Sequence, residues 1–254
     1  MKLSIKEMRN DKVLYNLYQI YKYIVFFPLL GMSTAALFGI IFIFLFMASE
    51  RFVQLAGILW ARFNSFVTPM FVKVIGEENI DRNQSYVVVA NHQSQYDIFV
   101  MYGWLPIDFR WVMKIELRKV PILGYYCYKA GHIYIDRSNH NAAIESINKA
   151  KNKIREGTSV VFFPEGTRSD SGQVTEFKKG AFRFAIDMGL PLLPVTIAGT
   201  RDILPANSIG LFPGNATMVI HKPIDTARFN DGTIDQLMAG ARQVIQKDLE
   251  KYGG

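Results

Sequence analysis

The chain has 254 residues, half of them hydrophobic, with a formal net charge of +7 and a pI near 9.4, which suits one sizeable α/β domain with a membrane attachment. A basic balance suits nucleic acid, an anionic membrane surface or a phosphorylated substrate, but no nucleic-acid-binding signature is present, so nucleic acid is disfavoured as a partner. The single cysteine, Cys127, excludes an intrachain disulfide, and the four histidines include no HxxxH pair, so we expect no metal site.

The first predicted elements are helices that attach the chain to a membrane. Residues 24–49 carry no charge, and this run is long enough to cross a bilayer core, which takes roughly 20 apolar residues as helix. Pro28 and Gly31 could divide the run into two shorter helices, so a re-entrant hairpin and one full span both remain open. A cleavable signal peptide is disfavoured because its apolar core would be only about 7–15 residues long and would start earlier.

Further helices are expected on both sides of this apolar run. Residues 1–22 interleave lysine and arginine with leucine and tyrosine, which predicts a basic interfacial helix. Residues 52–72 are apolar apart from Arg62 and Asn64, which predicts a second helix in the interface or packed on the soluble domain. We therefore assign residues 1–75 to N-terminal membrane-associated helices and residues 76–254 to one α/β domain.

From Ser85 onward, short β-branched runs alternate with helical patterns. The run at 86–90 is typical of a buried parallel strand. Similar runs follow at 109–113, 132–136, 159–163, 192–197 and 217–221. The alternation predicts an α/β fold with a mostly parallel central sheet flanked by helices, preceded by the N-terminal membrane-embedded helical segment.

Three helices are expected between and after these strands. One covers 143–154, where apolar residues share a face, and another covers 182–188 and ends at Gly189. The last begins with Thr233 and Gln236 as a capping box. Its apolar stripe consists of Ile234, Leu237, Ala241, Ile245 and Leu249.

A histidine and an aspartate directly follow the first strand, in the segment Asn91-His92-Gln93-Ser94-Gln95-Tyr96-Asp97. This is the carboxyl end of the strand, where α/β sheets usually place ligands. With His92 in the turn and Asp97 in the next helix, the two side chains can meet. A carboxylate on one ring nitrogen fixes the tautomer, and the other nitrogen can then take a proton from an alcohol. The alternative is a capping loop with a structural hydrogen bond.

Three more segments place polar or unusual residues near strand ends. The tight loop 163–169 carries Glu165 and Arg168 at its tip, and arginine offers donors that suit a phosphate. The strand at 132–136 is followed by Arg137, a second phosphate candidate, whereas His132 at its start is interpreted as structural. Pro194 lies within a strand and should mark an edge, a bulge or a strand end. An exposed ion pair and a solvated strand end are the alternatives for the first two.

Together these segments resemble the glycerolipid acyltransferase family of bacterial and eukaryotic 1-acyl-glycerol-3-phosphate acyltransferases. The resemblance spans roughly residues 85–200 and rests on the order of four blocks: Asn91-His92-x4-Asp97, then 131–137, then Phe163-Pro164-Glu165-Gly166-Thr167-Arg168, then Pro194. The His-x4-Asp pattern alone is weak, but followed by Phe-Pro-Glu-Gly-Thr-Arg it is highly specific. Tyr134 stands where many relatives have phenylalanine, which is a conservative difference.

The resemblance implies an enzyme that moves a fatty acyl group from acyl-CoA or acyl-acyl-carrier-protein to the sn-2 hydroxyl of lysophosphatidic acid. It implies His92 as general base and Asp97 as its charge partner, and it associates Pro194 with acyl-donor binding or site architecture. The implied substrate-binding residues are Lys114, Arg137, Glu165, Gly166, Thr167 and Arg168. No metal, cofactor or covalent acyl-enzyme is implied. The location of the donors places the site at the cytoplasmic face of the bacterial inner membrane.

Three other hypotheses remain. The acceptor could be glycerol-3-phosphate, a lysophospholipid with a larger head group, or a lyso-ornithine lipid. A lipid-directed serine hydrolase could use Ser94, but the chain has no Gly-x-Ser-x-Gly elbow. A non-enzymatic membrane adaptor would explain the apolar run and the basic charge, but it leaves His92, Asp97 and the 165–168 loop without a purpose.

Overall fold

The structure is a computed structural model, and it describes residues 11–43, 50–120, 123–136, 145, 154 and 157–253. Its strands are β1 (Met70–Ile75), β2 (Val87–Ala90), β3 (Asp108–Lys114), β4 (Ile133–Ile135), β5 (Thr158–Phe162), β6 (Leu192–Ala198) and β7 (Gly214–Ile220). Its α-helices are α2 (Lys12–Tyr21), α3 (Phe27–Ile43), α4 (Glu50–Val67), α5 (Tyr96–Trp104), α6 (Leu123–Lys129), α8 (Gly180–Met188), α9 (Thr200–Ile203) and α10 (Ile234–Tyr252). Short turns of other helix types are η1 (Lys22–Phe26), η2 (Glu77–Asn79) and η3 (Ile115–Lys119).

The strands form one seven-stranded sheet in the order β1-β7-β6-β2-β5-β3-β4. All neighbouring pairs are parallel except β6 and β7, which are antiparallel. The predicted mostly parallel sheet is therefore confirmed, and all six predicted strands are present. The order brings β2 between β5 and β6, so the carboxyl ends of these three strands lie side by side.

The first strand, β1, was not predicted. The sequence suggests a helix over 52–72, but α4 ends at Val67 and the chain turns at Pro69, whose φ is +31°. Residues Met70–Ile75 then pair in parallel with β7. Since this strand follows an apolar helix without any break in hydropathy, composition alone does not separate the two. Residues 70–75, which the prediction includes in the N-terminal segment 1–75, therefore form a strand of the sheet.

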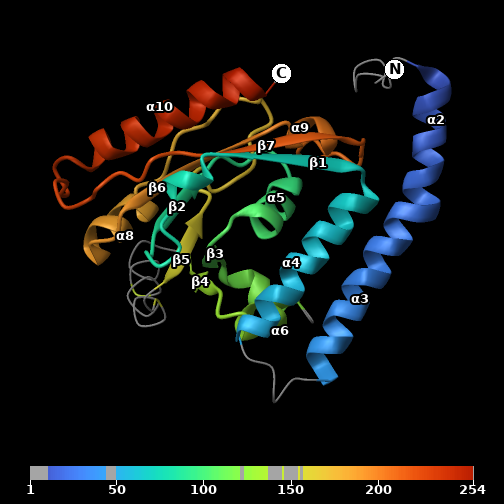
Figure 1. The fold of residues 1–254 in the computed structure, drawn as a ribbon, viewed down its shortest axis with the longest axis horizontal. Coiled ribbons are helices and arrows are strands. Elements are labelled where there is room, and N and C mark those ends of the chain that lie inside the picture. Colours follow the sequence, from blue (N-terminus) through green and yellow to red (C-terminus); the bar gives the residue numbers. More distant parts are fainter. Residues whose placement is uncertain are drawn as a thin grey trace.

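Helices cover both faces of the sheet (Figure 1). Alternate residues of β2 face opposite sides, as the pleat requires. Val88 and Ala90 pack with α5 and with parts of α4, whereas Val87 and Val89 pack with α8 and α10. All four β2 side chains are buried, which explains why the run is apolar throughout rather than alternating.

At the N-terminus, α2, η1 and α3 follow one another without a break, and α3 lies beside α4 (Figure 1). The interruption that Pro28 or Gly31 could cause does not occur. Instead, the helix widens into the π turn η1 directly before Pro28, and Phe27 N–H donates to Lys22 O. A proline has no N–H to donate, and a wider turn accommodates this loss.

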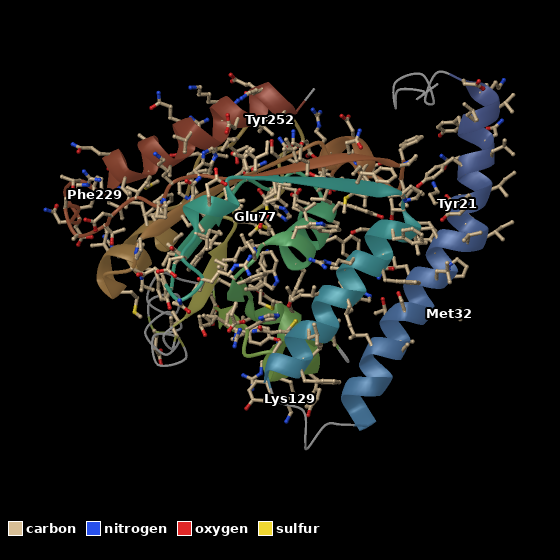
Figure 2. All side chains as sticks on the ribbon, in the orientation of Figure 1. Tyr21, Met32, Glu77, Lys129, Phe229 and Tyr252 are labelled. Atoms are coloured by element: carbon tan, nitrogen blue, oxygen red, sulfur yellow. The ribbon has the colours of Figure 1, made fainter. Side chains whose placement is uncertain are left out.

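α3 and α4 form an antiparallel pair. Trp60 Nε1 donates to Thr34 Oγ1 over 3.1 Å, and Ser33 Oγ contacts Asn64 Oδ1 over 3.2 Å. The stretch Lys12–Leu37 is one helix in the described part of the chain that is long and apolar enough to cross a membrane. Met32 is 67% exposed, and Figure 2 shows it on the side of α3 away from the sheet. The first ten residues of the predicted basic helix lie outside the described residues.

The outcome differs among the remaining predicted helices. Gly189 ends α8 in the left-handed region, as predicted, with φ +61°. The predicted apolar stripe of α10 is buried, but the capping box is wrong, because the Thr233 side chain does not cap the helix and instead accepts from Asn230 N–H. The helix predicted over 143–154 lies almost wholly outside the described residues.

Pro194 lies in β6, in the interior of the sheet, at a bulge. Val195 pairs with Ile220, whereas Leu192 bridges to Ile224, so the two residues between them on β6 oppose three on the other side. The irregularity falls where proline would otherwise leave a ladder hydrogen bond unmade, and a bulge is one of the three alternatives, an edge, a bulge or a strand end, that the sequence leaves open at this position.

Candidate active site

Three neighbouring strands supply the candidate site at their carboxyl ends. His92 follows β2, the loop 163–169 follows β5, and Thr200 follows β6. Asn91 joins two of these ends, because its Nδ2 donates to Ile197 O over 2.8 Å and its Oδ1 accepts from Ile197 N–H over 2.8 Å. The side chain thus continues the β2–β6 pairing past the last residue of β2, and it fixes the point at which His92 leaves the sheet.

His92 and Asp97 are in contact, as predicted. His92 Nδ1 lies 2.8 Å from Asp97 Oδ2. The aspartate side chain is fully buried and the histidine side chain is 15% exposed. A carboxylate only accepts hydrogen bonds, so Nδ1 carries the proton and Nε2 is the ring nitrogen left to accept one. Nε2 has no hydrogen-bond partner among the described residues.

The Asp97 carboxylate is held by further donors. Its Oδ2 also accepts from Gln93 N–H over 2.7 Å and from Ser94 N–H over 2.8 Å. Its Oδ1 accepts from Thr200 Oγ1 over 2.5 Å. Asp97 also lies in the first turn of α5, where the helix dipole favours a negative charge. Both oxygens of the buried carboxylate thus have donors, and its position allows it to support a protonated His92.

Aromatic rings fix the His92 ring from another side. The Phe163 ring is stacked on it, with centroids 4.0 Å apart and planes 11° apart. Trp111 stacks on Phe163 in turn, with centroids 5.3 Å apart. These contacts restrict the imidazole to one orientation, so the direction of Nε2 is set before any substrate binds.

Glu165 supports the main chain of His92. Its Oε1 accepts from His92 N–H over 2.7 Å. Its Oε2 accepts from Thr175 N–H over 2.8 Å and from Thr175 Oγ1 over 2.6 Å. Glu165 is 4% exposed, so both oxygens are occupied within the protein. The loop is tied to His92 a second time, because Ser169 N–H donates to His92 O over 2.8 Å.

The rest of the 163–169 loop forms a more open, basic rim. Gly166 has φ +77°, Thr167 is exposed and Arg168 is half-buried. Arg168 makes no hydrogen bond or ion pair within the described residues. A Cβ on Gly166 would lie 3.0 Å from Lys178 Nζ, so the Lys178 side chain crosses over this glycine. The exposed Lys178 thus lies beside the loop.

Two other predicted basic residues belong to more distant strands. Lys114 is the exposed last residue of β3, and β3 is separated from β2 by β5. Its backbone is therefore about 10 Å from the end of β2 across the sheet. Arg137 follows β4, one strand further out, and lies outside the described residues.

Two other residues that could be considered for catalytic roles, His132 and Ser94, make structural contacts instead. His132 is 1% exposed, contacts Tyr102 Oη through Nε2, and lies with Nδ1 3.3 Å from Trp111 N. Burial lowers its pKa to about 3, so it is neutral, and the interpretation of His132 as structural is confirmed. Ser94 is buried and its hydroxyl donates to Leu204 O over 2.6 Å rather than to His92, which contradicts a role as nucleophile.

Comparisons with known proteins agree with this arrangement. The family model described as Acyltransferase matches residues 71–198. A 1-acyl-sn-glycerol-3-phosphate acyltransferase of Chlamydomonas reinhardtii is 35% identical over 180 residues, which are 70% of this chain and 53% of that protein. The enzyme of the same name from Saccharomyces cerevisiae is 33% identical over 186 residues, which are 72% of this chain and 61% of that protein. The chain thus spans little more than half the length of these relatives.

A solved structure is similar over nearly its whole length. The crystal structure of the 1-acyl-sn-glycerophosphate acyltransferase PlsC from Thermotoga maritima superposes with a TM-score of 0.71 and 29% sequence identity. The alignment covers 98% of this chain and 97% of that one. The likeness therefore includes the N-terminal helices as well as the sheet.

Proposed function

Since the chain belongs to the acyltransferase family, we propose that it transfers a fatty acyl group to the sn-2 hydroxyl of lysophosphatidic acid and forms phosphatidic acid. The single observation that carries the proposal is the His92–Asp97 pair, with Nδ1 bound to a buried carboxylate and Nε2 free to act as a base. Relatives whose names state this activity support the choice of acceptor.

The chemistry needs one base and no covalent enzyme intermediate. His92 Nε2 removes the proton from the acceptor hydroxyl, and the oxygen attacks the carbonyl carbon of the thioester donor. Asp97 stabilises the imidazolium that forms. When the carbon–sulfur bond breaks, the imidazolium returns its proton to the departing thiolate, so the histidine is regenerated.

The acceptor phosphate binds on the basic rim. Arg168 lies on the same loop as Glu165, which anchors His92, so a phosphate held by Arg168 brings the attached glycerol close to the base. Lys178 beside Gly166 adds a second positive charge. Lys114, at the end of β3, extends the rim, and Arg137, which lies outside the described residues, is proposed as a further phosphate ligand. Glu165 is surrounded by three donors of the protein and acts by positioning His92 rather than by touching the substrate.

The N-terminal helices hold the site at a membrane, where the lipid acceptor resides. The exposed side chains of α2, η1, α3 and α4 include many large apolar residues. Because α3 and α4 are antiparallel, both can enter the lipid from the side on which the α/β domain lies. We place the domain at the cytoplasmic face of the bacterial inner membrane, where acyl-CoA and acyl-acyl-carrier-protein are both present as donors.

Acyl transfer in detergent micelles tests this function. Radiolabelled acyl-CoA or acyl-acyl-carrier-protein is supplied with lysophosphatidic acid, glycerol-3-phosphate or lysophosphatidylcholine. We expect phosphatidic acid from lysophosphatidic acid alone, and its loss in His92→Ala. The matched control is His221→Ala, because His221 has the same 15% side-chain exposure but contacts Thr196 and Asp248 instead of the site.

Each outcome separates the acceptor from the base. Transfer to another acceptor, still abolished by His92→Ala, would keep the mechanism and replace the substrate. Activity retained in His92→Ala would eliminate His92 as the base. Folded wild-type protein that transfers to none of the acceptors from either donor would reject the acyltransferase proposal and favour a membrane adaptor.

A further inference from the structure

We propose that Thr200 is a positioning residue for the reaction, so that Thr200, Asp97 and His92 act as one hydrogen-bonded chain. The inference rests on the proposed function of His92 as base. Thr200 is fully buried, and its hydroxyl donates to Asp97 Oδ1 over 2.5 Å. It lies two residues beyond the end of the matched family region.

The two oxygens of Asp97 are not equally supported. Oδ2 receives His92 Nδ1 and two backbone N–H groups. Oδ1 receives a hydrogen bond from Thr200 and from no other described residue. Both groups are fully buried, so water does not readily replace a missing donor. Without the hydroxyl, Oδ1 would have no hydrogen-bond donor. Rotation of the carboxylate would let Oδ1 accept from the backbone N–H groups, and Oδ2 would then no longer face His92.

The backbone holds Thr200 in place for this contact. Gly199 precedes it with φ +83°, and a Cβ at Gly199 would clash with Asn215 O, so only glycine fits this turn. The turn brings the start of α9 against α5, which carries Asp97. Leu204, just after α9, accepts a hydrogen bond from Ser94 Oγ over 2.6 Å. The segment after β6 therefore supports the His92 turn at two places, from the strand next to β2.

Two substitutions separate the hydroxyl from the shape of the side chain. Thr200→Val removes the donor and keeps the volume, whereas Thr200→Ser keeps the donor and removes a methyl group. The matched control is Thr226→Val, because Thr226 is 2% exposed and donates to Leu190 O over 2.9 Å, away from the site. All variants are compared as full-length protein in the same detergent, with thermal unfolding as the check on folding.

We expect Thr200→Val to lower kcat by about 10- to 100-fold, the range that corresponds to losing a hydrogen bond to a charged group. KM for lysophosphatidic acid should stay within about threefold, because Thr200 does not touch the substrate. Thr200→Ser and Thr226→Val should both keep kcat within about threefold of wild type. In an Asp97→Asn background, Thr200→Val should have no further effect, because the residue acts through Asp97.

The proposal is overturned if Thr200→Val retains wild-type kcat, if Thr200→Ser fails to restore it, or if the loss adds fully to that of Asp97→Asn. A second readout does not depend on turnover. In protein labelled with nitrogen-15 histidine, the His92 resonances, assigned with His92→Gln, report whether Nδ1 carries the proton. Wild type, Thr200→Ser and Thr226→Val should show the Nδ1–H form, and Thr200→Val a mixture of tautomers. An unchanged tautomer in Thr200→Val would reject the positioning role, and inactive wild-type protein with the expected tautomer would reject only the proposed function.

Discussion

Replacing Glu165 by glutamine should lower both the stability of the fold and the turnover of the enzyme. Glu165 accepts three hydrogen bonds, from His92 N–H, Thr175 N–H and Thr175 Oγ1. Glutamine keeps the shape and one acceptor oxygen, but it loses the charge and turns an N–H₂ group toward a backbone N–H. Two donors then face each other in a buried position, since Glu165 is only 4% exposed.

The size of the effect follows from the bonds that are lost. One charge-assisted hydrogen bond contributes about 1.5–3 kcal/mol, and the donor left without an acceptor adds to this loss. We expect the free energy of unfolding to fall by about 2–4 kcal/mol. For a domain of this size, each kcal/mol shifts the melting temperature by about 2–4 °C, so the midpoint should drop by on the order of 10 °C. The kcat should fall at least about tenfold, because the backbone that aims His92 is released.

Thermal unfolding and steady-state acyl transfer, both in detergent, check this prediction. The matched control is Glu176→Gln, on the same segment but at an exposed position, which should change neither property. An unchanged melting temperature with a raised KM for lysophosphatidic acid would refute the reasoning, because it would mean that Glu165 contacts the substrate instead of holding His92.

Three further predictions concern pH, the turn before α9 and the basic rim. Burial, followed by the Arg110 charge, lowers the pKa of His132 to about 3, whereas an unfolded histidine titrates near 6.5. As pH falls from 8 to 5 the unfolded chain takes up a proton that the folded chain does not, so denaturant titrations should show a loss of about 2 kcal/mol that His132→Asn reduces. Gly199→Ala should unfold at a lower temperature than wild type and lose activity, because φ +83° and the clash with Asn215 O both oppose a Cβ. A melting temperature of Gly199→Ala equal to that of wild type would contradict this prediction. Arg168→Ala should raise KM for lysophosphatidic acid about tenfold or more with a smaller change in kcat. An unchanged KM would show that Arg168 does not bind the phosphate.

The sequence predicts the strands that carry the site better than it predicts their arrangement. The runs before His92 and before Phe163 are short, apolar and β-branched, so both strands and both loops could be placed. The position of β5 and β6 on either side of β2 depends on pairing between distant segments. No local sequence pattern indicates such pairing. Thr200 shows this limit well. A threonine after a glycine has no motif of its own, and its role follows only from the sheet order that brings β6 beside β2.

Local signals also failed where tertiary contacts outweigh them. Thr233 and Gln236 have the spacing of a capping box, but the loop before α10 gives the Thr233 hydroxyl another partner, Asn230 N–H. Pro28 could break the helix, but the wider π turn η1 accommodates the missing N–H donor. In each case the sequence pattern is correctly identified, and a second arrangement satisfies the same backbone groups.

Two buried carboxylates bind different parts of His92. Asp97 binds the ring through Nδ1, and Glu165 binds the main-chain N–H, while Phe163 covers one ring face. The oxygens of both acids are occupied by donors of the protein, so a phosphate would be repelled by them and would find no free donor beside them. The positive charges of Arg168 and Lys178 lie on the outer rim. The proposed anionic acceptor would therefore dock from the rim, with its uncharged glycerol, rather than its phosphate, next to the proposed base.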